Sequence, residues 1–169
     1  MSTLVQVPPR SVSGDYCSSA LIRFLPEELS ERHTIDWMTY DDDGLGEALG
    51  AAFKASNEQY FGLVHHLHSR RLGQHGTAVL TLHLCPHESE TLDAALCDLG
   101  LTSADIISVR EDIKFTPCEL IRQDDNGNEF CVGTYRCRAD ALAQQRKLAA
   151  GFHKQDYWIR KHEHLSPSI

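Results

Sequence analysis

Residues 45–71, LGEALGAAFKASNEQYFGLVHHLHSRR, carry the longest regular pattern of apolar residues in the chain. The residues that recur at helical spacing are Leu45, Leu49, Phe53, Tyr60, Val64 and Leu67. This spacing predicts a single long helix of roughly seven turns. We expect the helix to end before Gly73, because glycine readily adopts the left-handed conformation that closes a helix.

Strands are predicted on both sides of this helix. Thr77–Cys85 (TAVLTLHLC) is rich in β-forming residues and apolar on both faces, which is typical of a central strand. Residues 20–25 (ALIRFL) and 34–40 (TIDWMTY) are expected to be shorter strands. A short helix beginning at Pro26 separates them, since the fixed φ of proline suits the first turn of a helix.

The C-terminal half contains two further helices and a hairpin in the expected order. A helix runs through Leu92 and Leu99 and ends at Gly100. Residues 105–115 fit neither a helical nor a strand period. The Asn126-Gly127 turn predicts a hairpin of residues 119–122 and 130–137, and a last helix is expected from about Ala139 to Ile159.

Strands and helices do not alternate strictly along this order, which favours the α+β class over α/β. We therefore predict an antiparallel or mixed sheet packed against the 45–71 helix and a C-terminal helix. Residues 1–19 are expected to be an arm or loop, 20–165 a single globular domain and 166–169 a tail.

Composition and charge argue against some classes of function. The chain of 169 residues has 16 Lys and Arg against 24 Asp and Glu, a formal net charge of −8. Such an excess of negative charge argues against direct nucleic-acid binding. No run of about 18 apolar residues and no signal-like N-terminus is present, so we expect a cytoplasmic protein with no membrane contact.

Six of the ten histidines lie between residues 65 and 87. His65 and His68 would share one face of a helix, and His83, Cys85 and His87 alternate to one side of a strand. Imidazole and thiolate are the usual zinc ligands, so these five residues define an alternative, a zinc-binding domain or zinc-dependent enzyme. No C-x-x-C or H-E-x-x-H spacing accompanies these residues. His65 and His68 are also explained as the solvated end of a helix, where a protonated imidazole interacts favourably with the C-terminal carbonyl groups.

A second alternative is a helix-turn-helix DNA binder at residues 92–112, with Gly100 in the turn. Its second helix would carry Asp105, Glu111 and Asp112, which would repel phosphate.

The sequence contains no complete catalytic or nucleotide-binding motif, which favours a non-enzymatic protein that acts through its surface. Our leading hypothesis is a small acidic protein-binding module, an inhibitor, immunity factor or regulator that binds a partner with a basic surface, such as a nucleic-acid-binding protein. No cofactor is expected. The candidate contact residues are the acidic clusters Asp41, Asp42, Asp43 and Glu47, and Asp124 and Asp125.

Overall fold

The computed structural model describes residues 4–8, 19–42, 45–67, 79–86, 88–151 and 155–162. The segment predicted as the long helix forms two antiparallel strands instead, β4 (Gly46–Lys54) and β5 (Tyr60–His66). Their register places Ala51 opposite Leu63 and Phe53 opposite Phe61. The helix prediction for 45–71 is therefore wrong, and a hairpin takes its place at the centre of the fold.

Two physical reasons explain the difference. Glycine inside a helix costs about 1 kcal/mol relative to alanine, and this segment contains Gly46, Gly50 and Gly62. In the sheet one of these glycines allows close approach, because a Cβ atom on Gly50 would lie 2.7 Å from Tyr40 Cε1. In addition, residues 50–53 are buried on both faces of the sheet, so the strand sequence is continuously apolar and imitates a helical pattern.

The hairpin belongs to a seven-stranded antiparallel sheet with the order β1-β4-β5-β6-β2-β7. β3 pairs with β4 beyond the end of β1 and is not on this path. The remaining strands of the large sheet are β1 (Val5–Val7), β2 (Ala20–Ile22), β3 (Met38–Asp42), β6 (Leu80–Cys85) and β7 (Ile106–Val109). Residues of the predicted arm thus contribute β1, and the predicted central strand lies in the interior as β6.

A three-stranded antiparallel sheet of order β10-β8-β9 forms the rest of the β-structure. Its strands are β8 (Cys118–Gln123), β9 (Glu129–Tyr135) and β10 (Asp156–Lys161). The hairpin predicted around Asn126-Gly127 is confirmed as β8 and β9.

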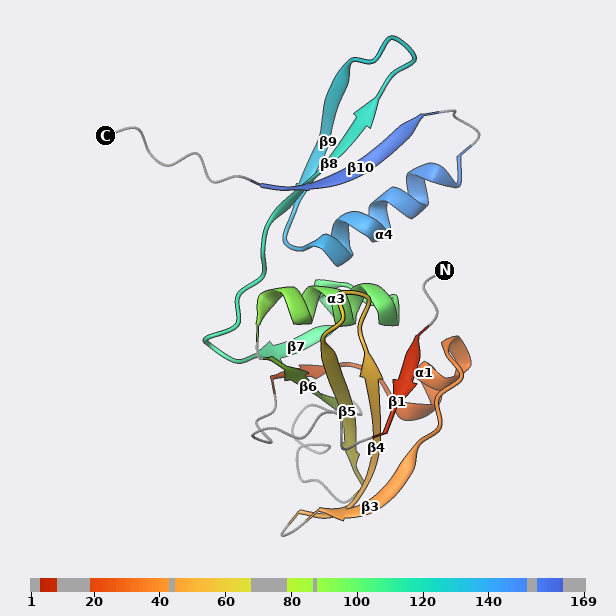
Figure 1. Cartoon of the computed structure of the whole chain (residues 1–169), viewed down its shortest axis with the longest axis vertical. Helices are drawn as coiled ribbons and strands as arrows, with labels where there is room; N and C mark the ends of the chain where they lie inside the picture. The colour runs from red at the N-terminus through yellow and green to blue at the C-terminus, as the bar shows by residue number, and fades with distance from the viewer. Residues whose placement is uncertain are drawn as a thin grey trace, which may run out of the picture.

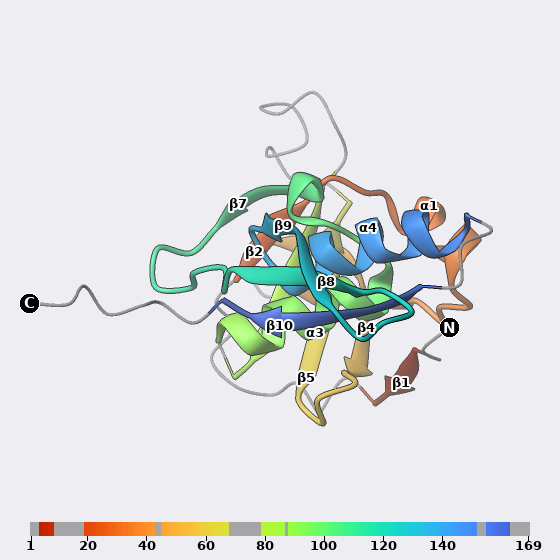
Figure 2. The ribbon, with the colours of Figure 1, turned by 90° about the horizontal axis from the view of Figure 1, so that it is seen from above.

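The helices are α1 (Pro26–Arg32), α3 (Ser89–Leu99), a short 3-10 turn η2 (Ser103–Asp105) and α4 (Arg138–Ala149). α3 and α4 lie between the two sheets, and α1 lies beside the large sheet (Figure 1). α3 contacts β5 and β6, α4 contacts all three strands of the small sheet, and the two helices contact each other. Figure 1 shows the resulting succession of small sheet, α4, α3 and large sheet along the long axis, and Figure 2 shows the small sheet and α4 covering α3 from above.

The apolar core lies between α3 and the large sheet. Phe53 and Phe61 are fully buried and stack with their ring centroids 5.1 Å apart. Leu92, Leu96 and Leu99 of α3 are buried in the same cluster. Cys137 and Ala139, at the beginning of α4, join this cluster as well. The contact between the two helices is thus partly apolar.

The α+β class is confirmed, as are the helices beginning near Pro26 and at Ser89. Gly100 closes α3 with a φ of +67°. The last predicted helix is half right, because α4 ends at Ala149 and Asp156–Lys161 is strand β10. The second helix of the predicted helix-turn-helix is wrong: Ile106–Val109 is strand β7, paired with β2, so its apolar residues serve a sheet.

Candidate protein-binding surface

One end of the large sheet carries two carboxylates side by side. Asp41 of β3 and Glu47 of β4 are direct partners in the antiparallel register, and both are exposed. Like charges at directly opposed positions of a strand pair are destabilising. Neither carboxylate has an ion-pair partner within the described residues. Among the described residues, this negative pair is therefore left without a compensating cation.

Exposed apolar side chains lie at the same end of the sheet, with Met38 and Tyr40 on the face opposite to Asp41 and Glu47. Of the seven large hydrophobic side chains that are exposed in the described part of the chain, four lie here: Met38 (50% exposed), Tyr40 (37%), Leu45 (63%) and Leu67 (36%). Backbone bonds hold two of them in place: the Leu45 N–H donates to the Asp42 carbonyl (2.8 Å), and the Leu67 N–H donates to the Glu47 carbonyl (3.0 Å). We call Met38, Tyr40, Asp41, Leu45, Glu47 and Leu67 the acidic hairpin surface.

Asp42, another member of the first acidic cluster, is paired with a histidine. Asp42 is bound within the molecule, because its Oδ2 lies 2.8 Å from Nε2 of His66 and both side chains are partly buried. Asp43 lies outside the described residues. Of the four predicted residues in this cluster, the structure thus brings together Asp41 and Glu47.

The second acidic cluster lies at the opposite end of the long axis, in the turn between β8 and β9 (Figure 1). Asp124 builds this turn: its carboxylate accepts hydrogen bonds from the N–H groups of Asn126 and Asn128 (2.9 and 2.8 Å) and from Nδ2 of Asn128 (3.0 Å). The hydrogen bonds from Asn128 lower the pKa of Asp124 below its ordinary value. Asp125 is exposed beside it. The two predicted clusters therefore cannot form one patch.

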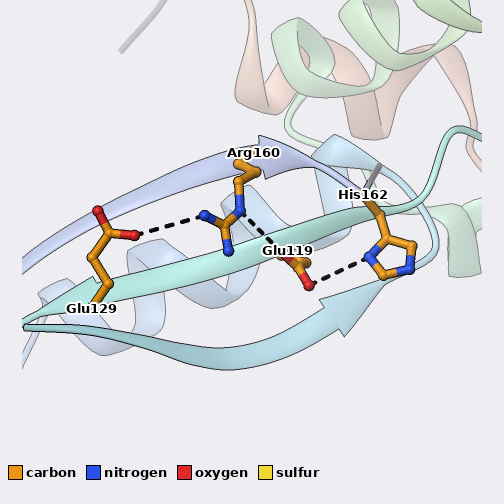
Figure 3. A network of polar contacts seen from close by, with 4 residues as sticks. All are labelled: Glu119, Glu129, Arg160 and His162. Carbon is orange, nitrogen blue, oxygen red and sulfur yellow. Dashed lines mark hydrogen bonds and ion pairs between the residues drawn. The ribbon is translucent and has the colours of Figure 1, made fainter. Parts of the chain in front are cut away.

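A second group of charged residues lies on the small sheet and is linked by ion pairs and hydrogen bonds. Arg160 Nε donates to Glu119 Oε2 (3.0 Å), Arg160 Nη1 lies 3.6 Å from Glu129 Oε2, and His162 Nδ1 lies 3.3 Å from Glu119 Oε1. Figure 3 shows this network on the face of the sheet turned away from α4. The hydrogen bond from Arg160 lowers the pKa of Glu119. Both carboxylates of this network thus have an internal partner, Arg160, unlike Asp41 and Glu47 among the described residues.

The described histidines of the window, His65, His66 and His83, do not assemble into one site. Along β5, His65 lies on the same face as Leu63. His83 is paired with Gly62, which lies on the other face, so the imidazoles of His65 and His83 lie on opposite faces of the sheet. His65 is 7% exposed, and its Nδ1 lies 3.1 Å from the Val79 carbonyl. His83 and Cys85 share a face, whereas His68 and His87 are outside the described residues. Among the described side chains, no three His, Cys, Asp or Glu groups are placed to hold a metal ion.

A buried acidic group links the two helices. Asp93 of α3 accepts hydrogen bonds from the Cys137 thiol and the Arg138 N–H at the beginning of α4, and its Oδ1 is buried without a partner in the described structure. Burial raises the pKa of Asp93 from 3.8 to about 6. Burial also raises the pKa of Cys97 to about 12 and that of Cys118 to about 11, so these thiols stay protonated and are poor nucleophiles at neutral pH.

Reasoning from the sequence identified the acidic part of the acidic hairpin surface and missed its apolar part. Met38 and Tyr40 alternate with Trp37 and Thr39, and Trp37 packs against the core. The signal was therefore present, since apolar residues of the parity opposite to a buried Trp37 point to the other face of a strand. Leu45 and Leu67 carried no such signal, because they were assigned to the buried stripe of a helix.

Among the described segments, no helix is long and apolar enough to span a membrane. Comparisons with protein-family models, with curated proteins and with solved structures each found no match for this chain.

Proposed function

We propose that this chain is a small acidic module that binds a basic surface of another protein through its acidic hairpin surface. The observation that carries the proposal is the direct pairing of Asp41 with Glu47 in the strand register, with no ion-pair partner among the described residues, at the end of the sheet that also exposes Met38, Tyr40, Leu45 and Leu67. Protein interfaces are enriched in Met and Tyr at their centre, and charge at the rim speeds encounter and selects the partner.

This arrangement also supports a role as an inhibitor, immunity factor or regulator. A partner whose basic surface binds nucleic acid would have that surface covered when the module is bound. The net charge of −8 extends the attraction beyond the contact residues, and salt would weaken it.

The test begins with site-specific photo-crosslinking in an extract of the source cells. A benzophenone amino acid replaces Thr39, which is exposed and lies next to Asp41. The matched control carries it at Glu111, an exposed residue after β7 at the far edge of the large sheet. We expect a crosslinked protein with a basic surface from position 39 that is absent from position 111.

The crosslinked partner is then purified, and its affinity is measured by calorimetry. Replacing both acids, Asp41→Asn with Glu47→Gln, is expected to weaken binding roughly tenfold or more, and raising the salt concentration should weaken the unmodified protein in the same direction. Crosslinking that is equal at both positions, no product at position 39, or an affinity unchanged in the double variant would each contradict the proposal.

A further inference from the structure

β3 is an edge strand with one strand neighbour, β4, in the described structure. Met38, Thr39, Tyr40 and Asp41 are all exposed. Outside the ladder to β4, Met38, Thr39 and Asp41 make no hydrogen bond in the part of the chain that is described. An edge of this kind presents a row of backbone donors and acceptors that another extended chain can pair with.

Other edges of the two sheets carry features that hinder such pairing, whereas β3 carries only the charges of Asp41 and Asp42, which repel an anionic strand but attract a cationic one. The pairing of β7 with β2 and that of β9 with β8 each contain a register shift. β10 ends with Arg160 and Lys161, and β1 has three residues. β3 pairs with β4 in continuous register over five residues and contains no proline or lysine. Bulges, lysine, proline and short length are the usual means of protecting an edge.

We infer that the partner binds as an extended basic segment that adds a strand to the open edge of β3. This inference rests on the function proposed above. A second copy of this chain is a poor occupant, because each copy would bring Asp41, Asp42 and Glu47 to the contact and each chain already has a net charge of −8. A cationic segment is complementary to the same charges.

The register of β3 and β4 specifies the side chains of that segment. Directly paired residues on adjacent strands lie about 4.5–5.5 Å apart at Cβ. A residue added opposite Asp41 extends the row of Glu47 and Asp41, so lysine or arginine is favoured there. The next residue lies opposite Tyr40 on the other face, where Tyr40 is paired with Ala48, so an apolar residue is favoured. The preferred ligand therefore alternates basic and apolar residues.

The test uses a capped peptide that alternates lysine and valine, below the concentration at which it associates with itself. Two control peptides separate the contributions: one is N-methylated at every second residue, and the other has the same composition with its lysines in one block. We expect the alternating peptide to bind and to slow hydrogen exchange at the amides of 38–42. We expect binding to weaken roughly tenfold on methylation, which removes the backbone donors of one edge.

Two protein variants distinguish this inference from the function on which it rests. The pair Asp41→Asn and Glu47→Gln removes the proposed charges, and the pair Glu111→Gln and Asp125→Asn removes the same number elsewhere. If the methylated or block peptide binds as tightly as the alternating one, or if the β3 amides stay unprotected, strand addition is wrong while charge-driven docking stands. If all three peptides bind both variant pairs equally, the proposed surface is wrong as well. If no peptide binds, strand addition is overturned, and the crosslinking at position 39 decides the proposed function separately.

Discussion

The seven-stranded sheet and the three-stranded sheet differ in what covers their faces. The large sheet buries Phe53, Phe61 and Leu63 completely beneath α3. The small sheet has α4 on one face and the charged network of Glu119, Arg160, Glu129 and His162 on the other. The comparison teaches that both sheets bury apolar side chains, Leu120 and Ile121 in the small sheet, and that the small sheet adds a charged network on its other face.

The joint between the two sheets is built from both kinds of interaction. Cys137 and Ala139 pack into the core of the large sheet. Polar contacts connect the same helices: Asp93 accepts from the first residues of α4, and Asp140 of α4 accepts from the N–H and Oγ of Ser103 (both 2.7 Å). On this basis we expect the two sheets to unfold together.

The largest expected effect comes from the core of the large sheet. Phe61→Ala removes a fully buried ring that stacks on Phe53, and truncations of this kind lower the free energy of unfolding by about 3–5 kcal/mol. Phe130→Ala is the matched control in the small sheet, where the ring is 44% exposed beneath Arg122, and should cost less than about 1 kcal/mol.

The two tryptophans allow each sheet to be followed separately during urea denaturation of this variant. Trp37 packs against the large-sheet core, and Trp158 is in β10. In single-tryptophan proteins both fluorescence transitions should move to lower urea together. A Trp158 transition that stays in place in Phe61→Ala would show instead that the small sheet unfolds on its own.

Asp93 should make stability depend on pH at the joint. Its pKa is raised from 3.8 to about 6 in the folded state, so the folded chain binds this proton more tightly than the unfolded chain. Its contribution to the free energy of unfolding is therefore greatest below pH 4, falls as the pH rises towards 6, and is lower by about 3 kcal/mol above that.

Asp93→Asn keeps the shape and removes the charge, so we expect the variant to be more stable at pH 7 by about 1–3 kcal/mol and to lose the decline between pH 4 and 6. Urea titrations across pH 4–8 measure both effects. Asp125→Asn, an exposed change, serves as the control. A decline of the same size in Asp93→Asn and in the unmodified protein would exclude Asp93 as its source.

The second polar contact at the joint is expected to have a somewhat smaller effect. Asp140→Ala leaves the Ser103 N–H and hydroxyl without their acceptor, which should cost about 1–3 kcal/mol. Thermal unfolding compares it with Asp156→Ala, an exposed residue of β10 with little expected effect. Equal melting temperatures for the two variants would mean that the joint does not depend on this contact.

The elements predicted correctly from the sequence are those whose signals are local. Gly100 ends α3, Asn126-Gly127 forms the β8–β9 turn and Pro26 begins α1, because each depends on the backbone preferences of one or two residues. The segment 46–66 could not be assigned in this way. Its apolar residues satisfy a helical and a strand period at once, and the choice between them depends on sheet partners and glycine contacts far away in the sequence.

The acidic hairpin surface shows the same difference between local signals and contacts that depend on distant residues. Asp41 and Glu47 were identifiable as acidic residues, but their direct pairing depends on the β3–β4 register, which a helix at 45–71 would not contain. Asp42 was expected to be exposed, and it binds His66, 24 residues along the chain. Reasoning from one sequence can thus name charged residues but cannot decide which of them the fold neutralises.

The smallest expected effect is the sharpest test of the difference between the sheets. Glu47→Gln removes the like-charge contact with Asp41 and should raise the free energy of unfolding slightly, by about 0.2–1 kcal/mol. Glu119→Gln in the small sheet should lower it, because this carboxylate accepts from Arg160 and lies beside His162. Both changes remove one negative charge from a glutamate. If the free energy of unfolding, measured by chemical denaturation at low salt, rises in one variant and falls in the other, a carboxylate without an internal partner is distinguished from one with an internal partner. If Glu47→Gln were destabilising, the carboxylate would have an internal role, and the case for Glu47 as a residue kept for a partner would be lost.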